Sequence, residues 1–434
     1  MKRQPYFAVL CTCLAAAVAL RFATAQESAP RQLRDVIEGK GFAQVKIALP
    51  EFEASAGDRA AAREFVETIR DDLSFSGYFD VVDPVLYGKV PADSKGAVPY
   101  DDWLAVGADA VTQGNYVTHD GRIEVEARLF DNPSKARTFG MKYSGTSDLL
   151  RRVAHQVSDD LIKQYTGRPG VAMTRIAYVA KHNGGKEIYI MDYDGQRIRR
   201  LTTSGTINLF PVWSPEGNRL AFVSWRGKQP GIRIMDADGQ LTSVPALRGE
   251  LNSTPSWFPD GKRLAFSSDA ERNSEIYTLT LASGQTTRLT RSPAIDTSPA
   301  VSPTGRQIAF TSDRGGSPQV YVMDPEGLNV SRLSPEGNYN DSPAWSPRGD
   351  RIVYASRIDG RFKLVVLDLE SRSITQLTRG NGNDEDPRWS PDGRHIVFSS
   401  NREGSYDIYV ITPDSGAIRR LTRGGDSVTA DWSH

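Results

Sequence analysis

The second half of the chain repeats one pattern of apolar and polar positions. Short runs that are apolar throughout follow tight turns containing glycine; they read RLAFVS, RLAFSS, QIAFTS, RIVYAS and HIVFSS. Such runs are typical of strands buried on both faces. The next run of each repeat alternates better, as in QVYVMD and DIYVIT, and a short fourth run ends in Leu-Thr or a near match. The pattern predicts units of four strands.

The repeat has a fixed period. The core of each unit is Trp-Ser-Pro or a close variant, and its prolines lie 44 residues apart; they are Pro215, Pro259, Pro303, Pro347 and Pro391. A period of about 40 to 50 residues is typical of β-propeller blades. The repeat therefore predicts a propeller with five blades that are complete in the sequence.

A sixth blade is expected from the two ends of the repeat region. Residues 175–202 match strands two, three and four of a blade, whereas residues 429–433, TADWS, match a first strand. Trp432 follows Trp389 by 43 residues, which is close to the period. Pairing the two segments would close the ring and hide its sheet edges. We therefore expect a six-bladed propeller at 171–434, closed by residues 421–434 against 175–202.

Residues 26–168 do not repeat. QVKIALP predicts a strand, and Asp58 is expected to cap a helix. The apolar face of that helix consists of Ala62, Phe65, Val66, Ile69 and Leu73. Alternating residues around Asp120-Gly121 predict a hairpin, and residues 147–165 predict a second amphipathic helix. The expected fold is mainly β, a six-bladed β-propeller with a smaller N-terminal α+β domain.

The first 25 residues have the pattern of an export signal. Lys2 and Arg3 precede an apolar stretch, and small residues occupy the cleavage positions before Gln26. Both cysteines, Cys11 and Cys13, lie in that stretch, so the mature protein should contain neither disulfides nor cysteine-based metal sites. The chain carries 53 basic and 53 acidic residues, and this balance gives no sign of a nucleic acid or a membrane surface as a partner.

Signatures of catalysis are missing from the sequence. The peptidase domain that follows similar propellers needs a Gly-x-Ser-x-Gly elbow, and no such motif occurs. The histidines stand singly, which predicts surface positions and no metal site; they are His119, His155, His182, His395 and His434. His155 is expected to form an exposed pair with Asp159. We expect no enzyme activity and no cofactor, and the alternative is a relative of propeller-containing peptidases or carbohydrate-active enzymes.

One polar column recurs five residues before each tryptophan position. Its members are Asn208, Asn252, Asp296, Asn340 and Asp384, with Ser427 in the sixth place. Such side chains bond their own backbone at turns, and a shared role at the mouth of the channel is the alternative. In a blade, the loop into strand one and the loop between strands two and three lie at the same end of the ring. These loops are variable and charged, so we expect this loop face to carry the binding site.

The chain resembles the TolB family, soluble periplasmic components of the Tol-Pal system. The resemblance rests on the export signal, the cysteine-free first domain with DDWLAVGADAVTQGNYV, the junction TRIAYVAKHNGGKEIYIMDYDG and the blade motif P-x-W-S-P-D-G. It implies a non-enzymatic adaptor in the periplasm that supports outer-membrane integrity and its invagination at cell division. It also implies two protein partners, the lipoprotein Pal and the inner-membrane protein TolA, for a monomer that does not itself insert into the membrane.

The resemblance, together with the loop face, assigns both partners to residues of this chain. The propeller is expected to bind Pal across its mouth through Leu251, Thr254, Thr297, Asp341, Asp384 and Asp386. The mature N-terminus is expected to engage TolA through Gln26, Glu27, Ser28, Arg31 and Leu33.

Overall fold

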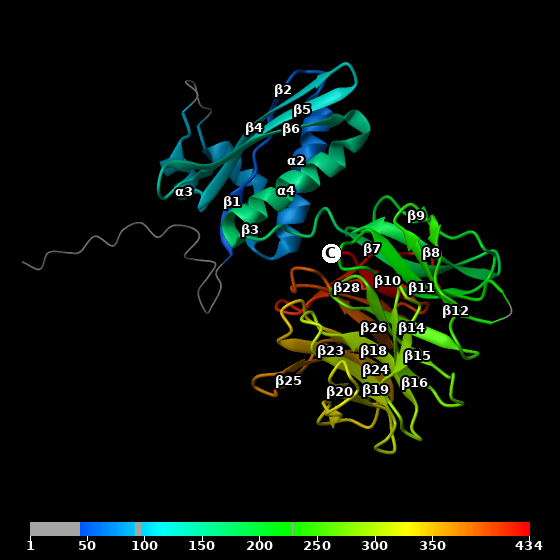
Figure 1. Cartoon of the computed structure of the whole chain (residues 1–434). Coiled ribbons are helices and arrows are strands. Elements are labelled where there is room, and N and C mark those ends of the chain that lie inside the picture. Colours follow the sequence, from blue (N-terminus) through cyan, green and yellow to red (C-terminus); the bar gives the residue numbers. More distant parts are fainter. Residues whose placement is uncertain (1–43, 92–96, 228) are drawn as a thin grey trace, which may run out of the picture.

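Two domains follow one another along the chain in the computed structural model (Figure 1). The structure describes residues 44–91, 97–227 and 229–434. The predicted export signal and the residues assigned to TolA, Gln26 to Leu33, lie outside the described residues. The predicted fold is confirmed: a six-bladed β-propeller with a mixed α/β domain before it.

The N-terminal domain packs helices against one sheet, whose strand order is β3-β1-β4-β5-β6, with β2 beside β4. Its strands are β1 (Val45–Ala48), β2 (Glu53–Ala54), β3 (Phe79–Val81), β4 (Ala110–His119), β5 (Arg122–Asp131) and β6 (Ala136–Thr146). Its helices are α2 (Arg59–Ser76), α3 (Tyr100–Ala105) and α4 (Leu150–Thr166), with 3-10 turns η1 (Pro84–Lys89) and η2 (Ser147–Leu149). The long helices α2 and α4 share one apolar core with β1, β3, β4 and β5.

Both long helices and the hairpin of this domain are confirmed. The predicted apolar face of α2 is buried along its whole length. Asp120 and Gly121 both have positive φ, 49° and 73°, as a two-residue hairpin turn requires. The expected cap differs, because the Asp58 carboxylate makes no bond to the first turn of α2. It accepts hydrogen bonds from the Ser55 hydroxyl (2.9 Å) and from the Thr118 amide (3.3 Å).

The propeller consists of six antiparallel four-stranded sheets. The first two blades are β10 (Asn208–Trp213), β11 (Arg219–Ser224), β12 (Gly231–Asp236) and β13 (Leu241–Thr242), then β14 (Asn252–Trp257), β15 (Arg263–Ser268), β16 (Glu275–Thr280) and β17 (Thr286–Arg288). The next is β18 (Asp296–Val301), β19 (Ile308–Ser312), β20 (Gln319–Met323) and β21 (Ser331–Arg332). Two more are β22 (Asn340–Trp345), β23 (Arg351–Ile358), β24 (Arg361–Asp368) and β25 (Ile374–Gln376), then β26 (Asp384–Trp389), β27 (Ile396–Ser400), β28 (Asp407–Thr412) and β29 (Ala417–Arg420).

The sixth blade is a composite of both ends of the propeller. It consists of β30 (Ser427–Trp432), β7 (Arg175–His182), β8 (Gly185–Asp192) and β9 (Arg199–Arg200). Strand β30 pairs with β7, so Trp432 lies opposite Ile176. The Trp432 ring is 2% exposed, and its Nε1 donates to Thr174 Oγ1 at 2.7 Å. The last strand of the chain is therefore fastened to Thr174, the residue just before β7, the first propeller strand in the sequence.

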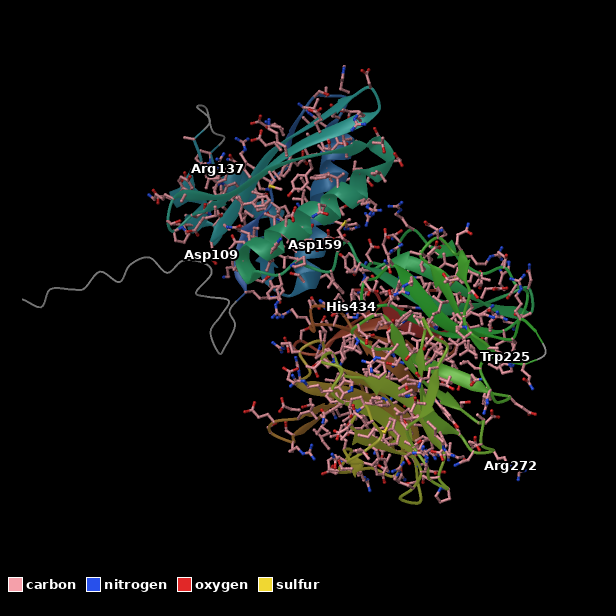
Figure 2. The ribbon with its side chains drawn as sticks, viewed as in Figure 1. Asp109, Arg137, Asp159, Trp225, Arg272 and His434 are labelled. Carbon is pink, nitrogen blue, oxygen red and sulfur yellow. The ribbon has the colours of Figure 1, made fainter. Side chains whose placement is uncertain are left out.

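The N-terminal domain packs against one end of the propeller. The propeller turns that contact this domain are of two kinds: those between strands one and two of a blade, and those between strands three and four. Arg394 Nε in the first kind of turn donates to Ser76 O at 3.0 Å, and the ring of Phe75 stacks on His395 at 4.2 Å. Asp194, in the second kind, pairs with Arg151 of α4. Figure 2 shows His434 close to the N-terminal domain, whereas Trp225 and Arg272 lie on loops on the far side. The loop face is thus the end that this domain leaves uncovered.

The expectation of surface histidines is wrong for His155 and His395. His155 is 3% exposed, and its Nδ1 lies 2.8 Å from a carboxylate oxygen of Asp72 on α2. Burial acts to lower the pKa of His155, but the bond and the charge of Asp72 outweigh it and raise the pKa. His395 is fully buried between Phe75 and Trp432, and burial lowers its pKa to about 4. Tertiary packing covers both side chains, and neither the helical period around His155 nor the strand pattern around His395 reports it.

Asp159 is buried too, and its partner is the linker between the domains. Its carboxylate accepts the amides of Ala172 and Met173, both at 2.9 Å. Burial raises the pKa of Asp159 to about 7, although these two hydrogen bonds act to lower it. The predicted exposed pair of His155 and Asp159 is therefore replaced by two separate buried contacts: His155 with Asp72 inside the N-terminal domain, and Asp159 with the linker.

Candidate functional site

A bulge interrupts the first strand of every blade at the mouth of the loop face. The residue that begins each bulge is not glycine, yet it has a positive φ between 47° and 54°; the six are Phe210, Thr254, Ser298, Ser342, Asp386 and Thr429. The pairing with the second strand shifts at each of these positions. The six residues form a ring around the channel, which we call the bulge ring.

This conformation opposes the intrinsic preference of the residues that adopt it. A non-glycine residue in the left-handed region costs about 1 to 2 kcal/mol, and strain of this kind gathers at binding and catalytic sites. Proline follows the strained residue in five blades, at Pro211, Pro255, Pro299, Pro343 and Pro387. Because proline has no N–H to donate, it suits a position that has left the hydrogen-bonding ladder. The bulge turns the strained residues toward the mouth.

The mouth is nearly closed at its centre. The depression among the bulge ring and its prolines has a volume of about 30 Å³, which is room for about one water molecule. The opposite end of the channel is wider, with a cavity of about 330 Å³ lined by Pro215, Pro259 and Pro303 among others. A partner on the loop face must therefore lie across the mouth, because it cannot enter it.

An apolar arc borders the mouth on three successive blades. Ile207, Leu251 and Ile295 occupy the position before the first strand, and 41%, 42% and 52% of their surfaces are exposed. Tyr339 takes the same position in the next blade and is partly exposed. Exposed branched apolar side chains on neighbouring elements are typical of surfaces that bind another protein.

An acidic sector completes the circle. Asp341 and Asp386 lie on neighbouring blades, and Ser342 Oγ bridges toward Asp386 at 3.3 Å. Burial raises the pKa of Asp386 to about 6; the charges of Asp341 and Glu385 add to this, and Arg388 opposes it. Glu385 accepts a hydrogen bond from the Tyr406 hydroxyl. The rim of the mouth thus offers apolar contacts on one side and negative charge on the other.

The structure brings five of the six residues assigned to Pal to this rim. Leu251 belongs to the apolar arc, Thr254 and Asp386 to the bulge ring, and Thr297 and Asp341 are partly exposed beside it. Direct contact by the sixth, Asp384, was a wrong expectation, because Asp384 is fully buried. Its carboxylate pairs with Lys363 Nζ at 3.2 Å and with Arg402 at 2.7 Å.

Asp384 belongs to the polar column, three of whose members tie neighbouring blades together. Asn208 Nδ2 donates to Glu187 of the preceding blade at 2.9 Å, and Asn340 Nδ2 donates to Gln319 at 2.7 Å. Each amide also bonds within its own turn. The turn interpretation is therefore correct but incomplete, and the column supports the mouth from below.

Sequence reasoning missed the bulge ring and two members of the apolar arc, Ile207 and Ile295. A signal for the bulge was present in five of the six blades, because the proline two residues before the tryptophan position cannot sit in a regular inner strand. The exposure of the two isoleucines carries no such signal, since strands also begin with buried isoleucine. In the described ranges, no three His, Cys, Asp or Glu side chains are placed to hold a metal ion. No helix within the same ranges is long and apolar enough to cross a membrane.

Models of two domain families match the chain. The model of the TolB beta propeller domain matches residues 162–370 and 340–434, and that of the TolB amino-terminal domain matches residues 34–138. The chain belongs to the TolB family. The two matches leave only short stretches of the described residues outside the family's domains.

Relatives and a solved structure agree with the family. The Tol-Pal system protein TolB of Bordetella avium is 39% identical over 199 residues, which are 46% of this chain and 44% of that protein. The protein of the same name from Dechloromonas aromatica is 37% identical over 195 residues, 45% and 44% of the two chains. These matches span less than half of the relatives' length. The crystal structure of TolB from Acinetobacter baumannii covers 90% of this chain and 97% of its own, with 28% identity and a TM-score of 0.79.

Proposed function

We propose that this protein is a non-enzymatic periplasmic adaptor of the Tol-Pal system. Its propeller holds the lipoprotein Pal across the mouth of the loop face, and its N-terminal region engages TolA. Through these two partners it supports outer-membrane integrity and the invagination of the outer membrane during cell division. Membership of the TolB family and the relatives named Tol-Pal system protein support this role.

The shape of the mouth carries the proposal. Pockets that bind small molecules have volumes of about 300 to 1,000 Å³, whereas the depression at this mouth has about 30 Å³. What the loop face offers is a broad rim with an apolar arc and an acidic sector. A protein surface with an apolar patch and basic residues beside it would complement both parts.

Five rim residues are proposed to touch Pal. Leu251 contributes apolar area, and Thr254 and Thr297 lie beside it on the rim. Asp341 and Asp386 contribute the negative charge of the acidic sector. Asp384 acts from below, because its bonds to Lys363 and Arg402 hold the strand that carries Asp386.

TolA is proposed to bind Gln26, Glu27, Ser28, Arg31 and Leu33. The described chain begins at Gln44, whose side chain donates to Gly77 O at 3.2 Å beside the end of α2. Gln44 thus lies at the junction of the two domains. If it couples the two partners, Pal must change the affinity for TolA by the same factor by which TolA changes the affinity for Pal.

Substitution on the two ends of one blade tests the proposal. Thr297→Arg places a long cation on the rim, and Thr304→Arg places the same side chain on an exposed turn at the other end of that blade. We expect Thr297→Arg to weaken binding of the Pal periplasmic domain at least tenfold in isothermal titration calorimetry. Thr304→Arg should leave the affinity unchanged. Equal affinities for both variants, or equal losses, would contradict docking on the loop face.

A further inference from the structure

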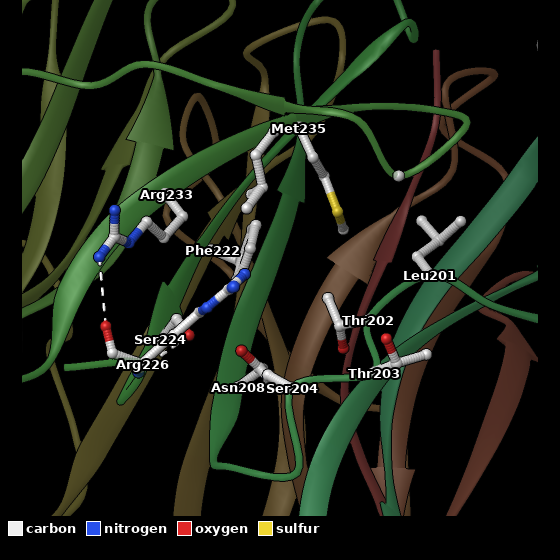
Figure 3. Close-up of a pocket in the computed structure, with 12 residues that line it drawn as sticks. Leu201, Thr202, Thr203, Ser204, Asn208, Phe222, Ser224, Arg226, Arg233 and Met235 are labelled. Carbon is white, nitrogen blue, oxygen red and sulfur yellow. Dashed lines mark hydrogen bonds between the residues drawn. The ribbon is translucent and has the colours of Figure 1, made fainter.

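A second cavity opens away from the mouth, in the groove between the composite blade and the blade of β10–β13. Its volume is about 280 Å³. Figure 3 shows Arg226 and Arg233 on one side and Leu201, Thr202 and Thr203 on the other, with Phe222 and Met235 between them. We call it the groove cavity. The proposed adaptor role does not use it.

The groove cavity lies where other blades carry a tyrosine side chain on the third strand, and this blade carries an arginine instead. In four blades a tyrosine of the third strand packs on an aromatic ring of the second strand, with centroids 5.6 to 6.0 Å apart. The pairs are Tyr189 on Tyr178, Tyr277 on Phe266, Tyr321 on Phe310 and Tyr409 on Phe398. In the blade of β10–β13 the tyrosine position holds Arg233, whose guanidinium turns away and donates to Arg226 O at 3.3 Å. The cavity lies beside the Phe222 ring, which is itself only 2% exposed.

The same blade also lacks a carboxylate that would neutralise Arg226. Arginines at the equivalent position of two other blades pair with the polar column, Arg314 with Asp296 at 2.8 Å and Arg402 with Asp384 at 2.7 Å. Here the column member is Asn208, which donates its amide to Glu187 instead. Within the described residues, neither Arg226 nor Arg233 is within ion-pair distance of a carboxylate.

Glu187 lies behind the lining residues Thr202 and Asn208, and its carboxylate is already engaged in hydrogen bonds. It is 1% exposed. One carboxylate oxygen accepts the Gly205 amide at 2.6 Å, and the other accepts the Thr202 hydroxyl and the Asn208 amide. Two exposed guanidinium groups therefore stand at the opening of a cavity whose floor, Phe222 and Met235, is apolar.

We propose that the groove cavity binds a small organic anion in which an aromatic ring lies next to a carboxylate, such as the end of a peptide whose last residue is aromatic. The ring enters the cavity beside Phe222, near the position that tyrosines fill in other blades, in the offset or tilted geometry that aromatic pairs prefer. The carboxylate accepts hydrogen bonds from Arg226 and Arg233, because the planar guanidinium suits a carboxylate. Ser224 and Thr203 line the polar rim.

Titration of the mature chain with N-acetyl-phenylalanine, followed by NMR, tests the proposal. We expect saturable binding with millimolar affinity, and at least tenfold weaker binding of N-acetyl-phenylalaninamide, which has the ring but no carboxylate. Arg226→Gln should weaken the binding of the acid to the level of the amide. Arg272→Gln, an exposed arginine on the matching loop of the next blade, is the control and should change nothing.

Arg233→Tyr tests the geometry, because it restores the ring that four other blades carry. This variant should remain folded, with an unchanged or higher melting temperature, and lose binding of the acid. Failure of the wild-type chain to bind at 10 mM probe would overturn the proposal, as would equal binding by wild type and by folded Arg233→Tyr. If Arg233→Tyr does not fold, Arg226→Gln decides, since undiminished binding by that variant also overturns it.

Discussion

The left-handed backbone of six non-glycine residues is the feature from which the mouth is built. Each of Phe210, Thr254, Ser298, Ser342, Asp386 and Thr429 bears the cost of a positive φ. A regular strand would instead alternate its side chains between the two faces of the blade. The bulge frees one residue per blade from that alternation, and the mouth gains a residue from each of six separate strands.

Asp386 adds an electrostatic cost to the conformational one, and this cost depends on pH. The pKa of its carboxyl is about 6 in the folded chain and has its ordinary value of about 3.8 in the unfolded chain. Between these values the folded state holds a proton that the unfolded state has lost. Stability is therefore lost as the pH rises from about 4 to about 6, and the cost persists at neutral pH.

We expect Asp386→Asn to be more stable than the wild type at pH 7.5, because it removes this cost. The gain is at most about 3 kcal/mol, less in proportion to the water that reaches the group, and it should vanish below pH 4. Melting temperatures across this pH range measure it. Asp359→Asn, an exposed aspartate on the same face, is the control. A gain for Asp386→Asn that stays constant from pH 4 to pH 7.5 would show that the carboxyl is not the source.

Among the elements, strand β30 closes the ring, because it is the first strand of the composite blade. It brings Trp432 into a core shared by the linker residues Val171 and Ala172, by β7 and by strands β27 and β28 of the neighbouring blade. Removal of a buried tryptophan side chain costs about 3 to 5 kcal/mol. The closing strand should therefore matter more to stability than its short length suggests.

Two tryptophan variants measure this contribution. Trp432→Ala should lower the free energy of unfolding by about 3 to 5 kcal/mol, seen as a fall of about 10 °C in melting temperature. Trp225→Ala, which removes a partly exposed tryptophan from the β11–β12 loop, should cost about 1 kcal/mol or less. Equal and small losses for both variants would mean that β30 does not hold the ring.

The elements also show what the sequence could predict. Blade number follows from a period of apolar runs, a property of local sequence, and so the six-bladed fold and the helix Arg59–Ser76 were predictable. The positions of His155 and Asp384 were not, because their burial comes from elements that pack over them from elsewhere in the chain. The groove cavity was predictable only in part. The exchange of tyrosine for Arg233 is visible in the repeat, but its consequence depends on the neighbouring blade.

The whole molecule has two unlike ends. One end of the propeller is covered by the N-terminal domain, through Arg394, Phe75 and the buried hydrogen bond that the Tyr193 hydroxyl donates to Asp72. The other end carries the bulge ring, the apolar arc and the acidic sector, and no described residue of the N-terminal domain is packed against it. Docking of Pal on the loop face, as proposed, would place Pal and the N-terminal domain at opposite ends of the propeller.

Hydrogen–deuterium exchange of the mature chain with and without the Pal periplasmic domain tests this account most directly. Amides at the mouth should exchange more slowly in the complex, at residues 207–210, 251–254, 295–298, 339–342 and 383–386. The turns at the other end, residues 215–218, 259–262 and 303–306, should exchange at the same rate in both samples. Protection confined to those turns or to the N-terminal domain, with the mouth unchanged, would contradict the claim that the bulge ring is where Pal docks.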